Sequence, residues 1–282
     1  MIPQTCLDLD KENMNKSHQA IGVFDSGMGG LTVLKALRHA LPQESFIYLG
    51  DTARLPYGTK SPHTVQQYAV QMARLLVERR VKALVIACNT ATTAALPHLQ
   101  AMLPDIPVLG VVSPGAGAAV AATKNNNIAV LATETTIAAN AYQQLIHAQI
   151  PDAIISARPC SVLVALAEEG MVDNAVARAA LQHYLADFDE EDTLLLGCTH
   201  FPVFKPLLRT LLPKDVCMVD SADATALALQ ALLTEKTLLN TDISTLGSVH
   251  YLVTDSVKRF QKVGEIFLGD TLSLTDIELV DA

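Results

Sequence analysis

The fold is decided by a stretch near the start of the chain, IGVFDSGMGGLTVLKAL, residues 21–37. Its mostly apolar opening, Ile21–Phe24, predicts a buried strand, and the apolar spacing that follows predicts a helix over Leu31–Leu41. A glycine-rich turn, residues 25–30, lies between them. A strand, a turn and a helix in this order are typical of parallel α/β architecture, in which a helix joins one strand to the next. The glycines match neither the dinucleotide-binding spacing nor a P-loop, which also needs a lysine, so by themselves they are a weak phosphate signal.

The same series of strands and helices is written twice along the chain. In the first half, Ala83–Ala87 runs into Cys88-Asn89-Thr90, and in the second half Leu194–Gly197 runs into Cys198-Thr199-His200. The two cysteines are 110 positions apart, a period far longer than the ~20–50 residues of solenoid repeats. We therefore expect two similar, doubly wound parallel-sheet α/β domains that face each other across a central cleft.

The repeat also predicts where the domains begin and end. Residues 1–19 are polar, without the apolar region or cleavage site of a signal peptide, and we interpret them as a mobile N-terminal extension. The first domain is expected to comprise residues 20–112 plus 220–282, because the tail after residue 239 has no counterpart in the middle of the chain. The second domain is expected to comprise residues 113–219.

Composition excludes several classes of function. Half of the 282 residues are hydrophobic, the net charge is −9, and the 20 basic residues are scattered, so nothing predicts a nucleic-acid surface. No apolar run reaches the ~18 residues of a membrane span. Together with the polar N-terminus, this predicts a cytoplasmic protein without a membrane partner.

Five cysteines, an odd number, argue against a disulfide framework. None are spaced as Cys-x-x-Cys, and no metal-ligand cluster or pyridoxal-phosphate lysine can be recognised, so we expect no metal and no cofactor. Cys160 and Cys217 are interpreted as packing residues and Cys6 as part of the tail. Cys88 and Cys198 differ, because each follows a strand at the equivalent position of its half.

In parallel sheets, functional residues gather beyond the carboxyl ends of the strands. Asp25-Ser26, Cys88-Asn89-Thr90, Thr133 and Cys198-Thr199-His200 all lie there, so one thiol is expected on each side of the cleft. A helix N-terminus should lower a thiol pKa from ~8.5 toward neutrality. Two such thiols on opposite faces of one carbon can remove a proton from one face and deliver a proton to the other, which inverts a stereocentre.

The remaining side chains of this edge suit that chemistry. Asn89, Thr90 and Thr199, with backbone amides at the helix starts, can stabilise the carboxylate of a carbanion-like transition state. Asp25 and His200 occupy matching strand ends of opposite halves, and each is expected to poise one thiol. We therefore take Cys88, Cys198, Asp25 and His200 as candidate catalytic residues.

These residues carry a resemblance to the glutamate racemase family. Four motifs in the right order resemble those of the family: Asp25-Ser26-Gly27-Met28-Gly29-Gly30, the loop Gly50–Gly58 with its Pro56-Tyr57-Gly58, Ala87-Cys88-Asn89-Thr90-Ala91, and Gly197-Cys198-Thr199-His200. The similarity covers residues 20–235. Phe201, Ser113, Ser161 and Ala165 depart from the commonest family pattern, which leaves the chemistry intact but bears on the domain seam and on subunit contacts.

The resemblance implies racemisation of glutamate by two thiols without pyridoxal phosphate, with D-glutamate supplied for peptidoglycan. It implies that Cys88 deprotonates D-glutamate and Cys198 deprotonates L-glutamate. The substrate-binding residues that it implies are Asp25, Ser26, Tyr57, Gly58, Asn89, Thr90, Thr199 and His200. It leaves the oligomeric state open, a homodimer included.

Two alternatives remain at this point. The first is aspartate racemase or a related cofactor-independent isomerase; Thr199-His200 after the second cysteine favours glutamate, since the aspartate enzymes more often carry an acidic residue there. The second is a two-domain amino-acid binding protein, which would have no reason to place a thiol on both faces of its cleft. Exchange of the substrate α-proton with solvent deuterium separates the enzymes from the binder.

Overall fold

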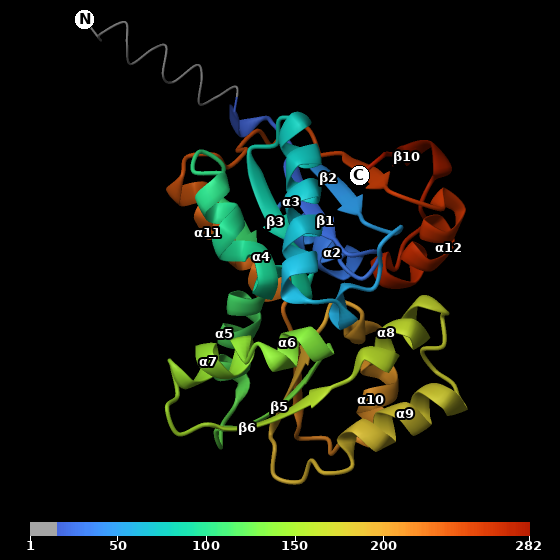
Figure 1. Ribbon diagram of the computed structural model, residues 1–282. Coiled ribbons are helices and arrows are strands. Elements are labelled where there is room, and N and C mark those ends of the chain that lie inside the picture. The colour runs from blue at the N-terminus through green and yellow to red at the C-terminus, as the bar shows by residue number, and fades with distance from the viewer. Residues whose placement is uncertain (1–15) are drawn as a thin grey trace, which may run out of the picture.

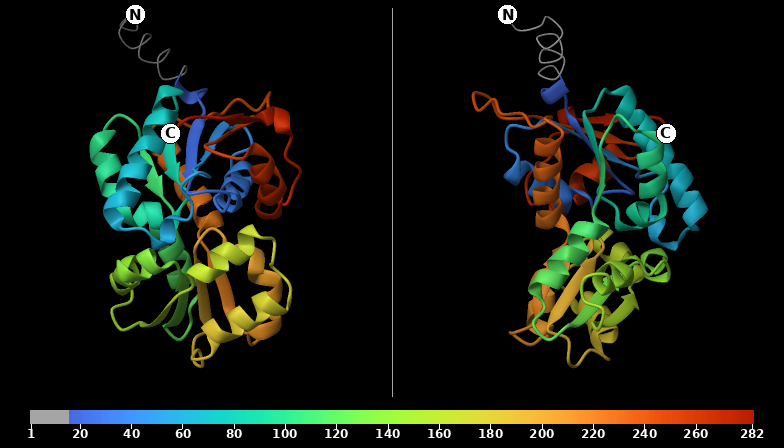
Figure 2. Two further views of the ribbon diagram at one scale, coloured as in Figure 1. Left: turned by 45° about the vertical axis from the view of Figure 1, so that its right-hand side comes forward. Right: turned by 90° about the vertical axis from the view of Figure 1, so that its left-hand side faces the viewer.

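The computed structural model describes residues 16–282, which form two lobes, each built around one sheet (Figures 1 and 2). The sheet of the first lobe has the order β10-β9-β2-β1-β3-β4, and the sheet of the second lobe has the order β6-β5-β7-β8. Every neighbouring pair of strands in both sheets is parallel. The strands are β1 (Ile21–Asp25), β2 (Phe46–Gly50), β3 (Ala83–Ile86), β4 (Val108–Gly110), β5 (Asn127–Ala132), β6 (Ile154–Pro159), β7 (Thr193–Gly197), β8 (Cys217–Asp220), β9 (Val249–Val253) and β10 (Ile277–Leu279).

Helices connect the strands and cover both faces of each sheet. They are α2 (Leu31–Ala40), α3 (Pro62–Glu78), α4 (Asn89–Met102), α5 (Val112–Ala122), α6 (Glu134–Ala138), α7 (Ala141–His147), α8 (Ser161–Glu168), α9 (Ala175–Leu185), α10 (Lys205–Leu211), α11 (Ala222–Glu235) and α12 (Val257–Leu268), with short 3₁₀ helices η1 (Tyr57–Thr59), η2 (Phe201–Phe204) and η3 (Leu274–Asp276). The predicted fold class, two doubly wound parallel-sheet domains, is confirmed.

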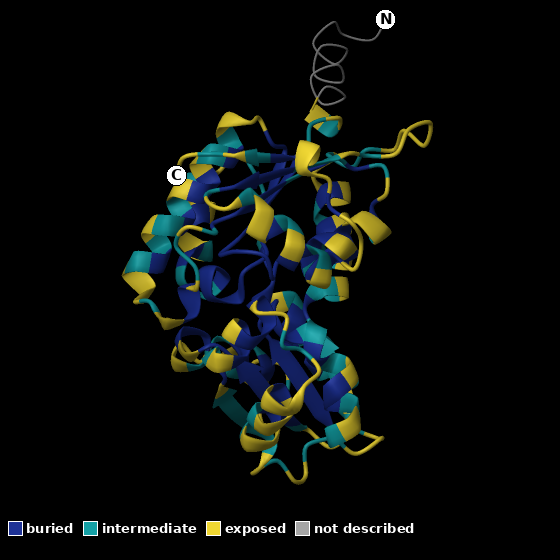
Figure 3. Cartoon of the chain, turned by 90° about the vertical axis from the view of Figure 1, so that its right-hand side faces the viewer, coloured by how far each residue is buried: buried dark blue, intermediate teal, exposed yellow. Residues whose placement is uncertain are grey.

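The hydrophobic core explains why the strands read as continuous apolar runs. Along β1, Val23 packs into the core on one face of the sheet and Phe24 into the core on the other, and both are fully buried. A strand covered by helices on both faces needs apolar side chains at every position. The cluster that contains Val23 continues to Leu196 of β7, so the two lobes share one core (Figure 3).

The path of the chain between the lobes supports the proposed domain division, which stays a prediction. The first lobe holds β1 to β4, the second holds β5 to β8, and β9 and β10 pair in the sheet of the first lobe. Residues 1–15 of the proposed extension 1–19 lie outside the described residues, as does Cys6. No helix in residues 16–282 is both long enough and apolar enough to cross a membrane.

The helical region that the sequence predicts from Val162 to Phe188 consists of two helices, α8 and α9. The chain turns at Gly170, whose φ of +69° is a left-handed conformation that glycine adopts readily. The turn leaves Glu168 as the last residue of α8, and this placement matters for the site.

Candidate active site

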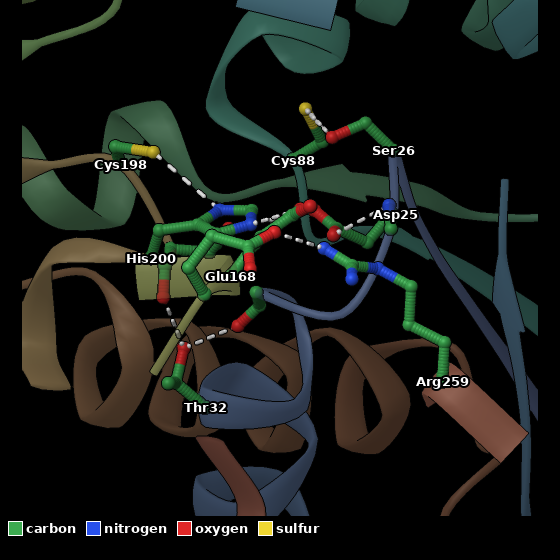
Figure 4. Close-up of polar contacts among 12 residues, drawn as sticks. Asp25, Ser26, Thr32, Cys88, Glu168, Cys198, His200 and Arg259 are labelled. Carbon is green, nitrogen blue, oxygen red and sulfur yellow. Dashed lines mark hydrogen bonds and ion pairs between the residues drawn. The ribbon is translucent and has the colours of Figure 1, made fainter. Parts of the chain in front are cut away.

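The candidate catalytic residues meet where the carboxyl ends of the two sheets face each other (Figure 4). Asp25 is the last residue of β1, Cys88 is the N-cap of α4 after β3, and Cys198 directly follows β7. All three side chains are buried, and so are those of Asn89, Thr90, Thr199 and His200. The structure therefore brings together, inside the protein, residues separated by up to 175 positions in the sequence.

Cys88 lies in the first lobe beside Ser26. Its thiol donates to Ser26 Oγ at 3.7 Å, and the backbone amide of Ala91, in the first turn of α4, donates to Cys88 Sγ at 3.4 Å. The expectation that the helix start lowers this thiol's pKa is wrong for the structure, because burial raises the pKa of Cys88 to about 12 and the charge of Asp25 adds to the rise. The Ala91 amide acts in the expected direction, but more weakly. Cys88 is therefore a protonated thiol at neutral pH.

Cys198 lies in the second lobe at one end of a chain of three side chains. His200 Nδ1 is 3.8 Å from Cys198 Sγ, and His200 Nε2 is 3.0 Å from Glu168 Oε1 (Figure 4). Burial lowers the pKa of His200, but its hydrogen bonds to Cys198 and Glu168 outweigh burial and raise that pKa to about 10. A positively charged ring therefore lies beside Cys198 Sγ, at 3.8 Å. The two thiols thus differ in what surrounds them.

Sequence reasoning missed Glu168. The only signal is a glutamate at the end of an otherwise apolar helix, and a surface position would have been the ordinary interpretation. Its side chain is nevertheless buried against His200. The next residue, Glu169, points to the surface and pairs with Arg259 of α12 at 2.9 Å. The ring of Phe267, also on α12, packs edge-on with the ring of His200 at a centroid distance of 5.1 Å.

The side chain of Asp25 forms hydrogen bonds with Gly27 of its own lobe and with Thr199 of the second lobe, and none with Cys88. Its Oδ2 accepts from the Gly27 amide at 2.9 Å, and its Oδ1 accepts from Thr199 Oγ1 at 3.4 Å. Burial raises the pKa of Asp25, and the charge of His200 opposes that rise. The carboxylate is thus placed to act on the Cys88 thiol through its charge.

Hydroxyl groups of both lobes meet beside Cys88. Thr90 Oγ1 of α4 lies 2.8 Å from Thr133 Oγ1 and 3.4 Å from Thr136 Oγ1 of the second lobe. Thr133 was noted at a strand end from the sequence, whereas Thr136 was not singled out. Three buried hydroxyls in contact can exchange their mutual hydrogen bonds for bonds to a carboxylate.

The Tyr57-Gly58 loop closes the same side of the site. The Tyr57 hydroxyl donates to buried Asp51, so this side chain is already engaged in the structure. Gly58 packs against Thr133, and a Cβ at that glycine would lie 2.6 Å from Thr133 Cγ2, too close for any larger residue. Thr135 Oγ1 also donates to the Gly58 carbonyl at 3.0 Å. The loop is thereby joined to the second lobe through its backbone.

Of the other cysteines in residues 16–282, neither Cys160 nor Cys217 makes a hydrogen bond to this cluster. Cys160 is buried, and its thiol donates to the Arg158 carbonyl at 3.3 Å, which agrees with its interpretation as a packing residue. The same interpretation is wrong for Cys217, which is exposed because it begins the edge strand β8. Within residues 16–282, no group of three or more histidine, cysteine, aspartate or glutamate side chains is arranged to hold a metal ion.

Comparison with known proteins agrees with this architecture. A family model described as Asp/Glu/Hydantoin racemase matches residues 21–229, which include both cysteines and all of the second sheet. The chain therefore belongs to the Asp/Glu/Hydantoin racemase family, a class of isomerases.

Within this family, the similar proteins are glutamate racemases. The glutamate racemase of Geobacter metallireducens is 47% identical over 256 residues, 90% of this chain and 94% of that protein. The glutamate racemase of Neisseria meningitidis serogroup C is 44% identical over 271 residues, 95% and 98% of the two chains. The resemblance to glutamate racemases that the four motifs indicated is thus confirmed.

Solved structures give the same result. Glutamate racemase from Francisella tularensis, solved in complex with D-glutamate, superposes with a TM-score of 0.86 at 38% identity, covering 94% of this chain and 98% of that one. The Bacillus anthracis enzyme gives 0.88 at 37% identity with the same coverage. Aspartate racemase of Picrophilus torridus, at 16% identity and a TM-score of 0.51 over 77% of this chain and 94% of that one, shares the fold alone.

Proposed function

We propose that this protein interconverts L- and D-glutamate by transferring protons to and from Cys88 and Cys198, without a cofactor. The observation that carries the proposal is the pair of buried thiols at the facing edges of two sheets, each with its own partners. The identity to glutamate racemases over nearly the whole chain supports glutamate as the substrate.

The two environments suit opposite roles in one turnover. Cys198, beside a protonated His200, starts as the thiolate and removes the α-proton of L-glutamate; Cys88 starts as the thiol and delivers its proton to the other face of the carbanion. The result is D-glutamate, a Cys88 thiolate and a Cys198 thiol. Proton exchange with solvent then restores the starting state, and D-glutamate reacts through the same steps in reverse. Assigning Cys198 to the L-enantiomer rests on family resemblance.

The buried donors around the thiols would bind the substrate. We propose that Asp25, Ser26, Asn89, Thr90, Thr199 and His200, with the Tyr57-Gly58 backbone, hold glutamate while it reacts. Because these residues are buried, the substrate enters when the two lobes separate. The separation breaks two hydrogen bonds between the lobes, one between Thr90 and Thr133 and one between Thr135 and Gly58. The carbanion forms only after closure, when fixed donors stabilise it best.

Racemisation in deuterium oxide tests the proposal. Purified protein in EDTA, without added pyridoxal phosphate, should convert L-glutamate to D-glutamate that carries one deuterium at Cα, while the unreacted L-glutamate stays unlabelled early in the reaction. A single base would return label to the starting enantiomer, and an amino-acid binding protein would give no exchange at all. Either result would overturn the two-thiol mechanism.

The D-glutamate so formed would supply peptidoglycan synthesis in the cytoplasm. Cells deprived of this protein should then require external D-glutamate for growth, and L-glutamate should not replace it. Growth without D-glutamate would contradict this cellular role and leave the chemistry untouched.

A further inference from the structure

Tyr142 lies in the second lobe, yet it contacts the residue that follows Cys88 in the first. It belongs to α7, and its side chain is completely buried. The Asn89 side chain donates from Nδ2 to the Tyr142 hydroxyl oxygen at 2.6 Å, and both partners are buried. This hydrogen bond joins α7 to the first turn of α4, two helices that belong to different lobes (Figure 1).

The ring of Tyr142 also packs beside the other thiol. Gly197 ends β7 immediately before Cys198, and a Cβ at this glycine would lie 2.8 Å from Tyr142 Cε2. Glycine is therefore required there for the tyrosine ring to approach the strand. Tyr142 thus touches the neighbour of each cysteine, Asn89 through its hydroxyl and Gly197 through its ring.

The other end of the Asn89 amide has no partner. Asn89 Oδ1 is buried, and no group in residues 16–282 donates a hydrogen bond to it. A buried acceptor that stays unpaired is costly, so such an atom points to a ligand that supplies the donor. A carbonyl oxygen accepts hydrogen bonds and cannot donate them, and the α-ammonium is the only donor group that glutamate carries at neutral pH.

We propose that Tyr142 is a positioning residue: its hydroxyl holds the amide nitrogen of Asn89, so that the amide oxygen accepts a hydrogen bond from the α-ammonium of the substrate. This inference rests on the proposed function and deepens it. Without the hydroxyl, the amide of Asn89 can rotate and present its nitrogen to the positively charged ammonium. Because the ammonium is present in both ground state and transition state, the effect falls on substrate binding.

The test compares two ligands in Tyr142→Phe. The KM for glutamate should rise about tenfold, the size expected for loss of one hydrogen bond to a charged group, while kcat stays within about threefold. Glutarate, which has both carboxylates but no ammonium, should inhibit wild type and variant with the same inhibition constant. Tyr251→Phe, which removes a hydroxyl from a buried tyrosine of β9, is the matched control and should change neither value.

A double-mutant cycle with Asn89→Ala identifies the route of the effect. If Tyr142 acts through Asn89, removing its hydroxyl in the Asn89→Ala background changes the KM no further. Additive effects, an unchanged KM in Tyr142→Phe, or an equal weakening of glutarate would each overturn the inference. Should Tyr142→Phe fail to fold by calorimetry, Asn89→Ala alone must still weaken glutamate and spare glutarate. A wild-type protein that binds glutamate without racemising it would refute the proposed function, whereas the binding comparison would still decide the role of Tyr142.

Discussion

Glu168→Gln is the most informative substitution in this site. It keeps the size of the side chain and an oxygen that can face His200 Nε2, and it removes only the negative charge. We expect the imidazolium of His200 to lose stability, because the negative charge that faces its Nε2 is gone. The substitution therefore weakens the group that assists Cys198 as a base and leaves the geometry of the site in place.

The magnitude follows from the pKa of His200. This pKa is about 10, against an ordinary value of 6.5, and the difference corresponds to about 5 kcal/mol in favour of the protonated ring. Cys198 and Glu168 together supply it, against the opposing effect of burial. If Glu168 supplies half, its loss costs about 2.5 kcal/mol, and kcat at neutral pH should fall by roughly 70-fold. The side chains of Glu168 and His200 are both buried, so solvent screens little of the attraction between them.

The assay follows the loss of optical rotation of L-glutamate between pH 6 and 10. Activity of Glu168→Gln should be low at neutral pH and should recover as the pH rises, since any thiol loses its proton more readily at high pH, with or without an imidazolium beside it. Glu169→Gln makes the same change one residue away on the surface and should retain wild-type activity. The reasoning fails if Glu168→Gln stays within threefold of wild type at pH 7. It also fails if the lost activity does not return at high pH, which would indicate a disturbed geometry.

Three further predictions concern the thiols, the histidine and the substrate. Cys88→Ser and Cys198→Ser should each abolish racemisation. Each variant keeps one thiol and should still catalyse loss of a leaving group from a β- or γ-substituted glutamate, and a chiral assay should show that the two variants prefer opposite enantiomers. The same preference in both variants would refute the two-thiol assignment. Because the folded pKa of His200 is raised, its contribution to stability is complete below pH 6.5 and is lost as the pH rises through about 10. Denaturant titrations should show this loss in wild type and not in His200→Asn. Glutamate should exceed aspartate by more than about tenfold in kcat/KM, and equal values would move the assignment to aspartate racemase.

The sequence alone determined the fold class and the pair of thiols. Both depend on local patterns: apolar runs covered on two faces define the strands, and the matching positions of Cys88 and Cys198 in a repeated unit place one thiol at the edge of each sheet. Asp25, Asn89, Thr199 and His200 were found for the same reason, because each lies within two residues of a strand end or of a cysteine. Such residues can be predicted because chain connectivity by itself positions them.

Only the tertiary structure decided which side chains act on the thiols, and in which direction. Glu168 lies at the end of one helix and Tyr142 near the start of another, and neither directly follows a strand. Their contacts with His200 and Asn89 arise from packing between distant segments. The raised pKa of Cys88 could not be predicted from the sequence for the same reason. Local structure predicted a thiol activated by its helix, but burial between two lobes outweighs the helix, and burial depends on all the segments that pack around a residue.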